Sequence, residues 1–165
     1  MNNVFLSMGS NMGDKNENLS KAVIMIQNLE NTFITLESSI YRTSPLYNSD
    51  QSYFLNKVVQ IKTKLNPYKL FKKMKSIEKM MGRCIENSHN FPRIIDIDIL
   101  TYGDLNISTY NLTIPHPKIC ERRFVLEPWC EIAPNHTIVN QQLSIQELLN
   151  NDHDLMNQSI EIVKN

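Results

Sequence analysis

Two aspartates, Asp96 and Asp98, are separated by one residue in the segment Ile94–Leu100, whose isoleucines predict a β-strand. Side chains of a strand alternate between its faces, so we expect both carboxylates on one face and the intervening isoleucines on the other. Two carboxylates this close repel each other unless a cation or a shared proton neutralises them, and Mg²⁺ prefers such hard oxygen ligands. The pair indicates metal–phosphate chemistry; a solvated sheet face, or pairing with lysines, is the alternative.

Basic residues lie on both sides of this strand in the sequence. Arg93 immediately precedes it, and His116 and Arg122 follow it. Arginine presents a planar fork of donors that suits phosphate, and the prolines on either side of His116 give it a stiff backbone suited to one fixed contact. Taken singly, each would be an ordinary solvated or satisfied polar residue. Together with the two aspartates, they favour a phosphate site.

Backbone binding of phosphate by a glycine-rich loop is not expected. The segment Gly9–Gly13 lacks the Lys-Ser/Thr of a P-loop and does not fit Gly-x-Gly-x-x-Gly, and the chain has only 4 glycines. Metal and side-chain contacts must therefore hold the phosphates.

A flat ring could be recognised on another predicted strand, Phe54–Thr63. Phe54 and Asn56 are two residues apart and therefore share a face, so the phenyl ring could stack on a heterocycle while the amide contacts its edge. An ordinary half-buried core phenylalanine is the alternative for these residues alone.

Hydrophobic periodicity places these residues in an α+β order of strand, helix, two strands, helix and strand, which predicts a ferredoxin-like antiparallel sheet with helices packed on its faces. The expected elements are a strand Val4–Met8 closed by a turn at 9–11, a helix with apolar residues at 19–29, strands Thr32–Tyr41 and Phe54–Thr63 around a loop at 42–51, a helix Asn66–Met81 capped by Gly82, an exposed segment at 83–93, the strand Ile94–Leu100 before a turn at 102–104, a short strand near Ile107, a helix Arg123–Ile132, and a terminal helix opened by the capping box of Ser144 and Glu147.

Length and composition exclude several classes of protein. A chain of 165 residues predicts a single domain, 1–165. Its 17 Lys and Arg balance 17 Asp and Glu, so the excess of positive charge expected of a nucleic-acid or membrane-surface binder is missing. No apolar run approaches a membrane span and the first residues do not form a secretory leader, so we expect a cytoplasmic protein. The 3 cysteines include no Cys-x-x-Cys pair, and thus predict neither a disulfide framework nor a zinc site.

Several short segments, in this order and spacing, resemble one enzyme family, the 6-hydroxymethyl-7,8-dihydropterin pyrophosphokinases of folate biosynthesis. The most specific is Pro92–Asp98. The segments are Leu6–Asn11, Tyr41–Leu46, Phe54–Asn56, Ile77–Glu78, Gly82–Arg83, Pro92–Ile99, Ile114–His116 and Arg122–Pro128.

The resemblance implies an ATP- and Mg²⁺-dependent transferase. It would move pyrophosphate from ATP to the hydroxymethyl group of the pterin, giving AMP and the pterin diphosphate, as a monomer that acts on small molecules, without nucleic-acid or membrane partners. It implies catalytic roles for Arg93, Asp96 and Asp98, with two Mg²⁺ ions on the aspartates. The implied ATP contacts are Lys75, Glu78, His89, Arg93, Ile99, Thr113, His116 and Arg122, and the implied pterin contacts are Thr43, Pro45, Leu46, Phe54, Asn56, Asp96 and Phe124.

The chain departs from the usual family pattern in and around the two segments that form mobile loops in the family, 43–51 and 83–93. Tyr47 replaces a frequent glycine, Ile85 an arginine, and Asn90 a tryptophan, while Lys75 replaces a glutamine outside those loops.

Two other classes of function fit part of this pattern. A metal-dependent phosphohydrolase or nuclease could use Asp96 and Asp98 with water as the acceptor, and would release phosphate without pterin. A non-catalytic ligand-binding module would keep its ligand affinity after Asp96→Ala. Neither accounts for both the Thr43–Asn56 and the Arg122–Phe124 motifs.

Overall fold

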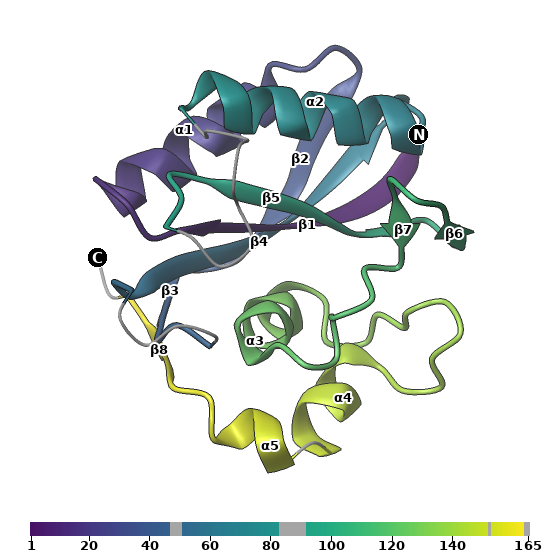
Figure 1. Cartoon of the computed structure of the whole chain (residues 1–165). Helices are drawn as coiled ribbons and strands as arrows, with labels where there is room; N and C mark the ends of the chain where they lie inside the picture. Colours follow the sequence, from purple (N-terminus) through teal and green to yellow (C-terminus); the bar gives the residue numbers. More distant parts are fainter. Residues whose placement is uncertain (47–50, 83–91, 152, 164–165) are drawn as a thin grey trace.

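An antiparallel sheet with helices on both faces forms the centre of the molecule (Figure 1). The computed structural model describes residues 1–46, 51–82, 92–151 and 153–163. In chain order the elements are β1 (Asn2–Ser10), α1 (Lys15–Gln27), β2 (Thr32–Glu37), β3 (Tyr41–Thr43), β4 (Phe54–Thr63), α2 (Pro67–Met80), β5 (Asp96–Tyr102), β6 (Ile107–Ser108), β7 (Thr113–Ile114), α3 (Arg123–Ile132), α4 (Ile145–Asn151), α5 (His153–Met156) and β8 (Ile160–Ile162).

The larger sheet has the order β5-β1-β4-β3-β8, with β2 pairing beside β3 along the long strand β4. Every pairing in it is antiparallel, and β6 and β7 form a separate two-stranded ribbon. Figure 1 shows α1 and α2 over one face and α3 and α4 over the other. The predicted α+β, ferredoxin-like class is therefore confirmed.

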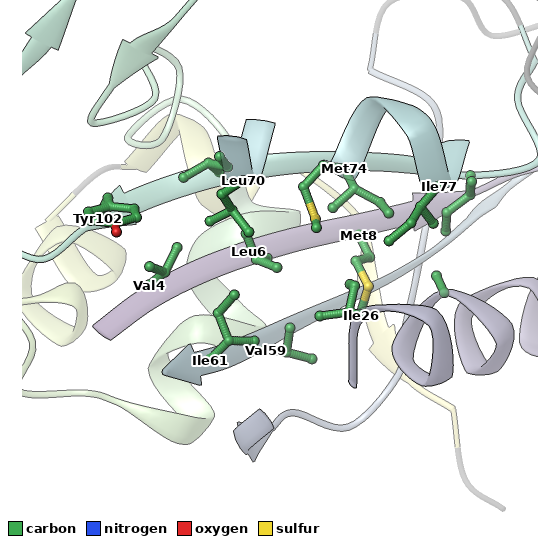
Figure 2. Packing of buried hydrophobic residues seen from close by; sticks show 14 of the residues in the cluster. Val4, Leu6, Met8, Ile26, Val59, Ile61, Leu70, Met74, Ile77 and Tyr102 are labelled. Atoms are coloured by element: carbon green, nitrogen blue, oxygen red, sulfur yellow. The ribbon is translucent and has the colours of Figure 1, made fainter. Parts of the chain in front are cut away.

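The face under α1 and α2 carries the larger core. Leu70, Met74 and Ile77 recur at helical spacing along α2 and are essentially inaccessible to solvent, as are Leu6 and Met8 of β1 beneath them (Figure 2). The predicted caps of α2 are present: Asn66 accepts a hydrogen bond from the Lys69 backbone N–H at 2.9 Å, and Gly82 has a φ of 99° just beyond the helix. This helix covers β5 and β1, the strands that carry the aspartates and their neighbours.

The opposite face packs against α3 and α4 through an aromatic group. Phe5 of β1 lies 5.0 Å from Trp129 of α3 and 4.8 Å from His136, measured between ring centroids. Leu100, two residues after Asp98 in β5, belongs to the same apolar cluster. Because side chains two residues apart share a face, Asp96 and Asp98 lie on the α3 side of the sheet, away from α2.

The strand predicted over Thr32–Tyr41 is wrong as a single element. It divides into β2 and β3, because both pair with β4 and the chain leaves the ladder between them. There the hydroxyl of Ser38 accepts from the Val58 N–H, at 3.0 Å, in place of a regular strand partner. Arg42 and Thr43, expected in a loop, belong to β3.

Smaller differences concern the ends of elements. β1 continues through Gly9 and Ser10, where a turn was expected; α1 ends at Gln27, before Leu29; and β5 begins at Asp96 and extends to Tyr102. The capping box of Ser144 and Glu147 opens α4 as predicted, but the chain continues into α5 and β8. β8 forms by pairing with β3, which is distant in the sequence, so local periodicity does not predict it.

Among the described residues, no helix combines the length and apolar character needed to cross a membrane.

The aromatic group predicts a loss of stability in acid. Burial lowers the pKa of His136 from its usual 6.5, against a smaller opposing effect of Asp104. As pH falls, the unfolded chain therefore takes up a proton at this histidine before the folded chain does. The contribution of His136 to stability, which is complete above pH 6.5, should decline as pH falls below that value. We expect urea unfolding of His136→Phe to lose less stability than wild type between about pH 7.5 and about pH 5.5. An equal loss in the two proteins would contradict this assignment; His116, with a pKa shifted in the same direction, accounts for a residual slope.

Candidate active site

A single row across the sheet brings together residues from four strands. Gly9 of β1 pairs with Asp96 of β5 on one side and with Asn56 of β4 on the other, and Asn56 in turn pairs with Tyr41 of β3. Residues directly opposite one another in an antiparallel ladder point to the same face. This cross-strand row (Asp96, Gly9, Asn56 and Tyr41) therefore faces α3, and its glycine leaves space between the carboxylate and the amide.

The gap at Gly9 is closely fitted to its neighbour. A Cβ at this position would lie 2.8 Å from the Asn56 Oδ1 atom. Asn56 is buried, and its Nδ2 donates to the Thr43 Oγ1 at 2.8 Å, which fixes the direction of the amide. Glycine is thus required at position 9 for this orientation of Asn56.

The acid pair, Asp96 and Asp98, is surrounded by basic side chains. Arg93 Nη1 lies 2.5 Å from Asp96 Oδ2, while Arg122 Nη1 and His116 Nε2 lie 3.6 and 3.7 Å from Asp98 Oδ2. The side chains of both aspartates are about a quarter exposed. The contacts to Asp98 are too long for strong hydrogen bonds, so its carboxylate can accept further ligands.

Two donors in this cluster lack acceptors within the described part of the chain. The Nε atoms of Arg93 and Arg122 are buried and have no hydrogen-bond partner among the described residues. Buried donors are normally satisfied, and an unsatisfied one points to a missing partner such as an ion or ligand. Burial also lowers the pKa of His116, against the opposing effect of Asp98, so its imidazole is mainly neutral at neutral pH. The cluster is therefore suited to an anionic group placed beside the aspartates.

Asn11 holds Arg93 in place through its backbone. The Arg93 N–H donates to the Asn11 side-chain oxygen at 2.7 Å, and the Asn11 N–H donates to the Arg93 carbonyl at 3.1 Å. The Asn11 amide also donates to Gln51 Oε1 at 2.9 Å. The buried Asn11 side chain therefore links Gln51, which follows 47–50, to Arg93, which lies just after 83–91.

The outer edge of β5 is held by α2. The Ile97 N–H, between the two aspartates, donates to Glu78 Oε1 at 2.7 Å, and Lys75 Nζ donates to the same oxygen at 2.8 Å. Burial raises the pKa of Glu78, and Lys75 opposes that rise. An edge strand leaves its N–H groups without a strand partner, so this carboxylate supplies the acceptor that fixes the backbone of the acid pair.

A cavity of about 230 Å³ lies beside β5, and Asp98 of the acid pair is part of its lining. Its walls combine aromatic and aliphatic side chains with a few polar groups, which suits an apolar ring with polar edges. It is lined by Phe71, Ile97, Asp98, Ile99, Tyr110, Asn111, Leu112, Thr113, His116 and Pro117.

Most of the residues implied by the resemblance lie around these features. Ile99 and Thr113 line the cavity, Phe54 lies in β4 opposite Thr43, and Phe124 at the start of α3 has its ring centroid 5.5 Å from the Arg122 guanidinium carbon. Pro45 and Leu46 follow β3, where Leu46 is exposed. His89, Ile85, Asn90 and Tyr47 lie outside the described residues, which omit 47–50 of the segment 43–51 and 83–91 of the segment 83–93.

The sequence did not single out several residues that shape this site. Phe71 and Leu112 line the cavity, Asn11 anchors Arg93, and Gly9 forms the gap in the cross-strand row. Gly9 and Asn11 stand within the segment Leu6–Asn11 that carried the resemblance, which is the one signal that could have identified them. Their roles depend on strand register, which is not a local property of the sequence.

The acid pair fits Mg²⁺ better than a metal held by many protein ligands. Within the described ranges, no group of three or more His, Cys, Asp or Glu side chains is arranged to hold a metal. Mg²⁺ is commonly bound through one or two carboxylates, with water and substrate phosphate completing its shell. Two aspartates on one strand face, beside two unsatisfied arginine donors, match that arrangement.

Comparison with known proteins identifies relatives across most of the chain. Residues 5–134 match the family model for 7,8-dihydro-6-hydroxymethylpterin-pyrophosphokinase (HPPK). The 2-amino-4-hydroxy-6-hydroxymethyldihydropteridine pyrophosphokinase of Bacillus subtilis is 43% identical over 134 residues, which are 81% of this chain and 80% of that protein. The enzyme of the same name from Haemophilus influenzae is 36% identical over 92% of this chain and 95% of its own length.

Solved structures share the fold. The crystal structure of wild-type Plasmodium falciparum HPPK-DHPS with pteroate superimposes with a TM-score of 0.74 at 18% identity. The match covers 91% of this chain and 42% of that one, so this chain corresponds to less than half of the larger protein.

The edge contact of β5 yields a prediction about stability. Glu78→Ala would leave the buried Ile97 N–H without its acceptor, which should lower the free energy of unfolding by roughly 1–3 kcal/mol. Urea denaturation measures this loss. Glu17→Ala is a suitable control, because it removes an exposed helix ion pair with Lys21 and should cost less than about 0.5 kcal/mol. Equal losses in the two variants would mean that Glu78 does not secure the strand edge.

Proposed function

The chain belongs to the 7,8-dihydro-6-hydroxymethylpterin-pyrophosphokinase family, ATP- and Mg²⁺-dependent enzymes of folate biosynthesis, and we propose that it carries out that reaction on the α3 face of its sheet. Pyrophosphate would pass from ATP to the hydroxymethyl group of 6-hydroxymethyl-7,8-dihydropterin, leaving AMP. The observation that carries this proposal is the acid pair, which is flanked by Arg93 and Arg122 and whose Asp96 lies in the same cross-strand row as Asn56.

Asp96 and Asp98 are the proposed Mg²⁺ ligands, for two ions. The chemistry that bound Mg²⁺ supplies here is neutralisation of charge on the phosphate oxygens. Two carboxylates with four oxygens between them can serve two ions only if water and phosphate complete both shells, which partial exposure of the pair permits.

Arg93, His116 and Arg122 are the proposed phosphate contacts. The two buried Nε donors would find acceptors in the triphosphate, and the long distances from Asp98 to His116 and Arg122 leave those side chains able to turn toward it. His89 stays a prediction from the sequence as a further phosphate contact.

The cavity beside β5 is the proposed site for the nucleoside part of ATP. Ile99 and Phe71 provide apolar surface for a purine, and Thr113 provides a polar edge. Lys75 and Glu78 lie next to this region on α2, with Lys75 Nζ 3.4 Å from the Ile97 carbonyl. The cavity shares Asp98 and His116 with the phosphate site, which supports one continuous binding path for ATP.

The pterin is proposed to bind over Gly9, between the rings of Phe54 and Phe124. Asn56 and Thr43 would contact its polar edge, because their mutual hydrogen bond fixes the amide while each retains further donor or acceptor capacity. Pro45 and Leu46, directly after β3, would close the slot. This placement brings the hydroxymethyl group toward Asp96, the neighbour of Gly9 in the cross-strand row.

With both substrates in these positions, the protein acts chiefly by orienting them. The hydroxyl oxygen of the pterin would attack the β-phosphorus in line while the bond from that phosphorus to the α,β-bridging oxygen breaks, and the hydroxyl proton passes to solvent. Arg93 and Arg122 would stabilise the charge that develops on the phosphate oxygens. The monomeric state and the cytoplasmic location both stay predictions from the sequence.

Incubation with ATP, Mg²⁺ and 6-hydroxymethyl-7,8-dihydropterin tests the proposal. We expect AMP and the pterin diphosphate in equal amounts, and no AMP without pterin. Asp96→Asn and Asp98→Asn should each lower turnover by about 10²-fold or more while the circular dichroism spectrum is unchanged, because each replaces a charged carboxylate ligand with a neutral amide. Phosphate release without pterin would instead support a phosphohydrolase, and pterin binding that produces no AMP would support a binding module.

Gly9→Ala tests the proposed pterin slot. The added Cβ would displace the Asn56 amide, so we expect KM for the pterin to rise roughly tenfold with KM for ATP nearly unchanged. In an Asn56→Ser background, where the clashing oxygen is absent, the same substitution should have a much smaller effect on stability measured by thermal unfolding. A proportional rise in both KM values would place the pterin away from Gly9.

A further inference from the structure

Glu131, outside the proposed site, ties the last turn of α3 to the connection between β2 and β3. Its two carboxylate oxygens accept from the Ser39 N–H at 3.1 and 2.9 Å, and Oε1 also accepts from the Ser39 hydroxyl at 2.8 Å. Its Oε2 accepts from the Tyr41 hydroxyl at 3.0 Å. One side chain thus bridges two segments about 90 residues apart in sequence.

This contact lies where the sheet itself provides little support. Residues 38–40 are outside both strands, and Ser38 is attached to β4 through its hydroxyl and its own N–H to Val58. The Tyr41 side chain is buried, and burial raises the pKa of its hydroxyl, with a further contribution from Glu131. The hydroxyl therefore stays protonated and continues to donate to the carboxylate.

At the other end of α3 lies Phe124, one of the two aromatic walls proposed for the pterin slot. Phe124 and Glu131 are seven residues apart, close to two helical turns, so they share a face of α3 and are separated by roughly 10 Å along its axis. The contact of Glu131 with the β2–β3 connection therefore helps to set the position of Phe124 over the sheet.

The sheet end of the same contact leads to the opposite wall of the slot. Tyr41 and Thr43 are two residues apart in β3 and share a face, and Thr43 pairs in register with Phe54. Thr43 also accepts from Asn56. Glu131 thus joins the helix that carries one aromatic wall to the strand that lies beside the other wall and the polar edge.

We propose that Glu131 is a positioning residue for the pterin site, which fixes the spacing between Phe124 and the pair Phe54 and Thr43. This inference rests on the proposed function, because the spacing matters only if a flat ring binds between these residues. The cavity and the Glu78 contact lie on other elements, and α3 contributes only Arg122, its N-cap residue, to the proposed ATP site, so losing Glu131 should affect the pterin site much more than the ATP site.

Steady-state kinetics of Glu131→Ala, Glu131→Gln and Tyr41→Phe test this role. We expect Glu131→Ala to raise KM for 6-hydroxymethyl-7,8-dihydropterin by roughly tenfold or more, with KM for ATP changed less than about twofold. Glu131→Gln keeps the length and one acceptor oxygen, so it should restore part of the loss, and Tyr41→Phe removes one contact and should have a smaller effect. If Glu131→Ala does not fold, these two variants carry the test.

Glu127→Ala is the matched control. Glu127 lies in the same helix and accepts from Arg123, one turn earlier, at 2.9 Å, so its removal takes a carboxylate from α3 without touching the β2–β3 connection. We expect wild-type KM values for both substrates. Parallel changes in both KM values for the Glu131 variants, or an unchanged KM for the pterin, would overturn the positioning role.

Calorimetric titration of pterin separates this inference from the proposed function. If wild-type protein binds the pterin but forms no AMP, the catalytic proposal fails, while weaker pterin binding by Glu131→Ala still supports the positioning role. Equal pterin binding by wild type and Glu131→Ala overturns the positioning role alone. If wild type does not bind the pterin, both are overturned.

Discussion

The register of three neighbouring strands is the constraint on which the site depends. With Gly9 paired to Asp96 on one side and to Asn56 on the other, a carboxylate, a gap and an amide follow one another across the α3 face. A shift of one residue in either ladder would turn the carboxylates or the amide to the opposite face, under α1 and α2. The buried cores on both faces hold this register, because neither set of apolar side chains can be exchanged for the other.

Electrostatic balance in the site repeats the neutral total charge of the chain on a local scale. Asp96 and Asp98 are close enough to repel each other, and Arg93, Arg122 and His116 surround them without forming tight pairs at Asp98. This incomplete pairing distinguishes the site from a structural ion-pair network, in which every donor would be satisfied. Glu78 and Asn11 act differently. They accept hydrogen bonds from the backbone N–H groups of Ile97 and Arg93, and so hold the backbone segments from which the charged side chains extend.

The sequence was sufficient for features that depend on local pattern. The period of two placed Asp96 and Asp98 together, and Asn66, Pro67 and Gly82 defined the ends of α2. It was insufficient where contacts between distant segments determine the structure. The break between β2 and β3 arises because both strands pair with β4, and β8 exists only by pairing with β3. In the sequence, Glu131 is an ordinary polar helix residue, and its role is visible only from its contacts with Ser39 and Tyr41.

A crystal structure of the protein with Mg²⁺, a non-hydrolysable ATP analogue and 6-hydroxymethyl-7,8-dihydropterin is the most direct measurement of this account. It should place the metal on Asp96 and Asp98, and the pterin over Gly9 with its ring between Phe54 and Phe124 and its polar edge on Asn56. A pterin bound away from the cross-strand row, or a metal held by other residues, would contradict it.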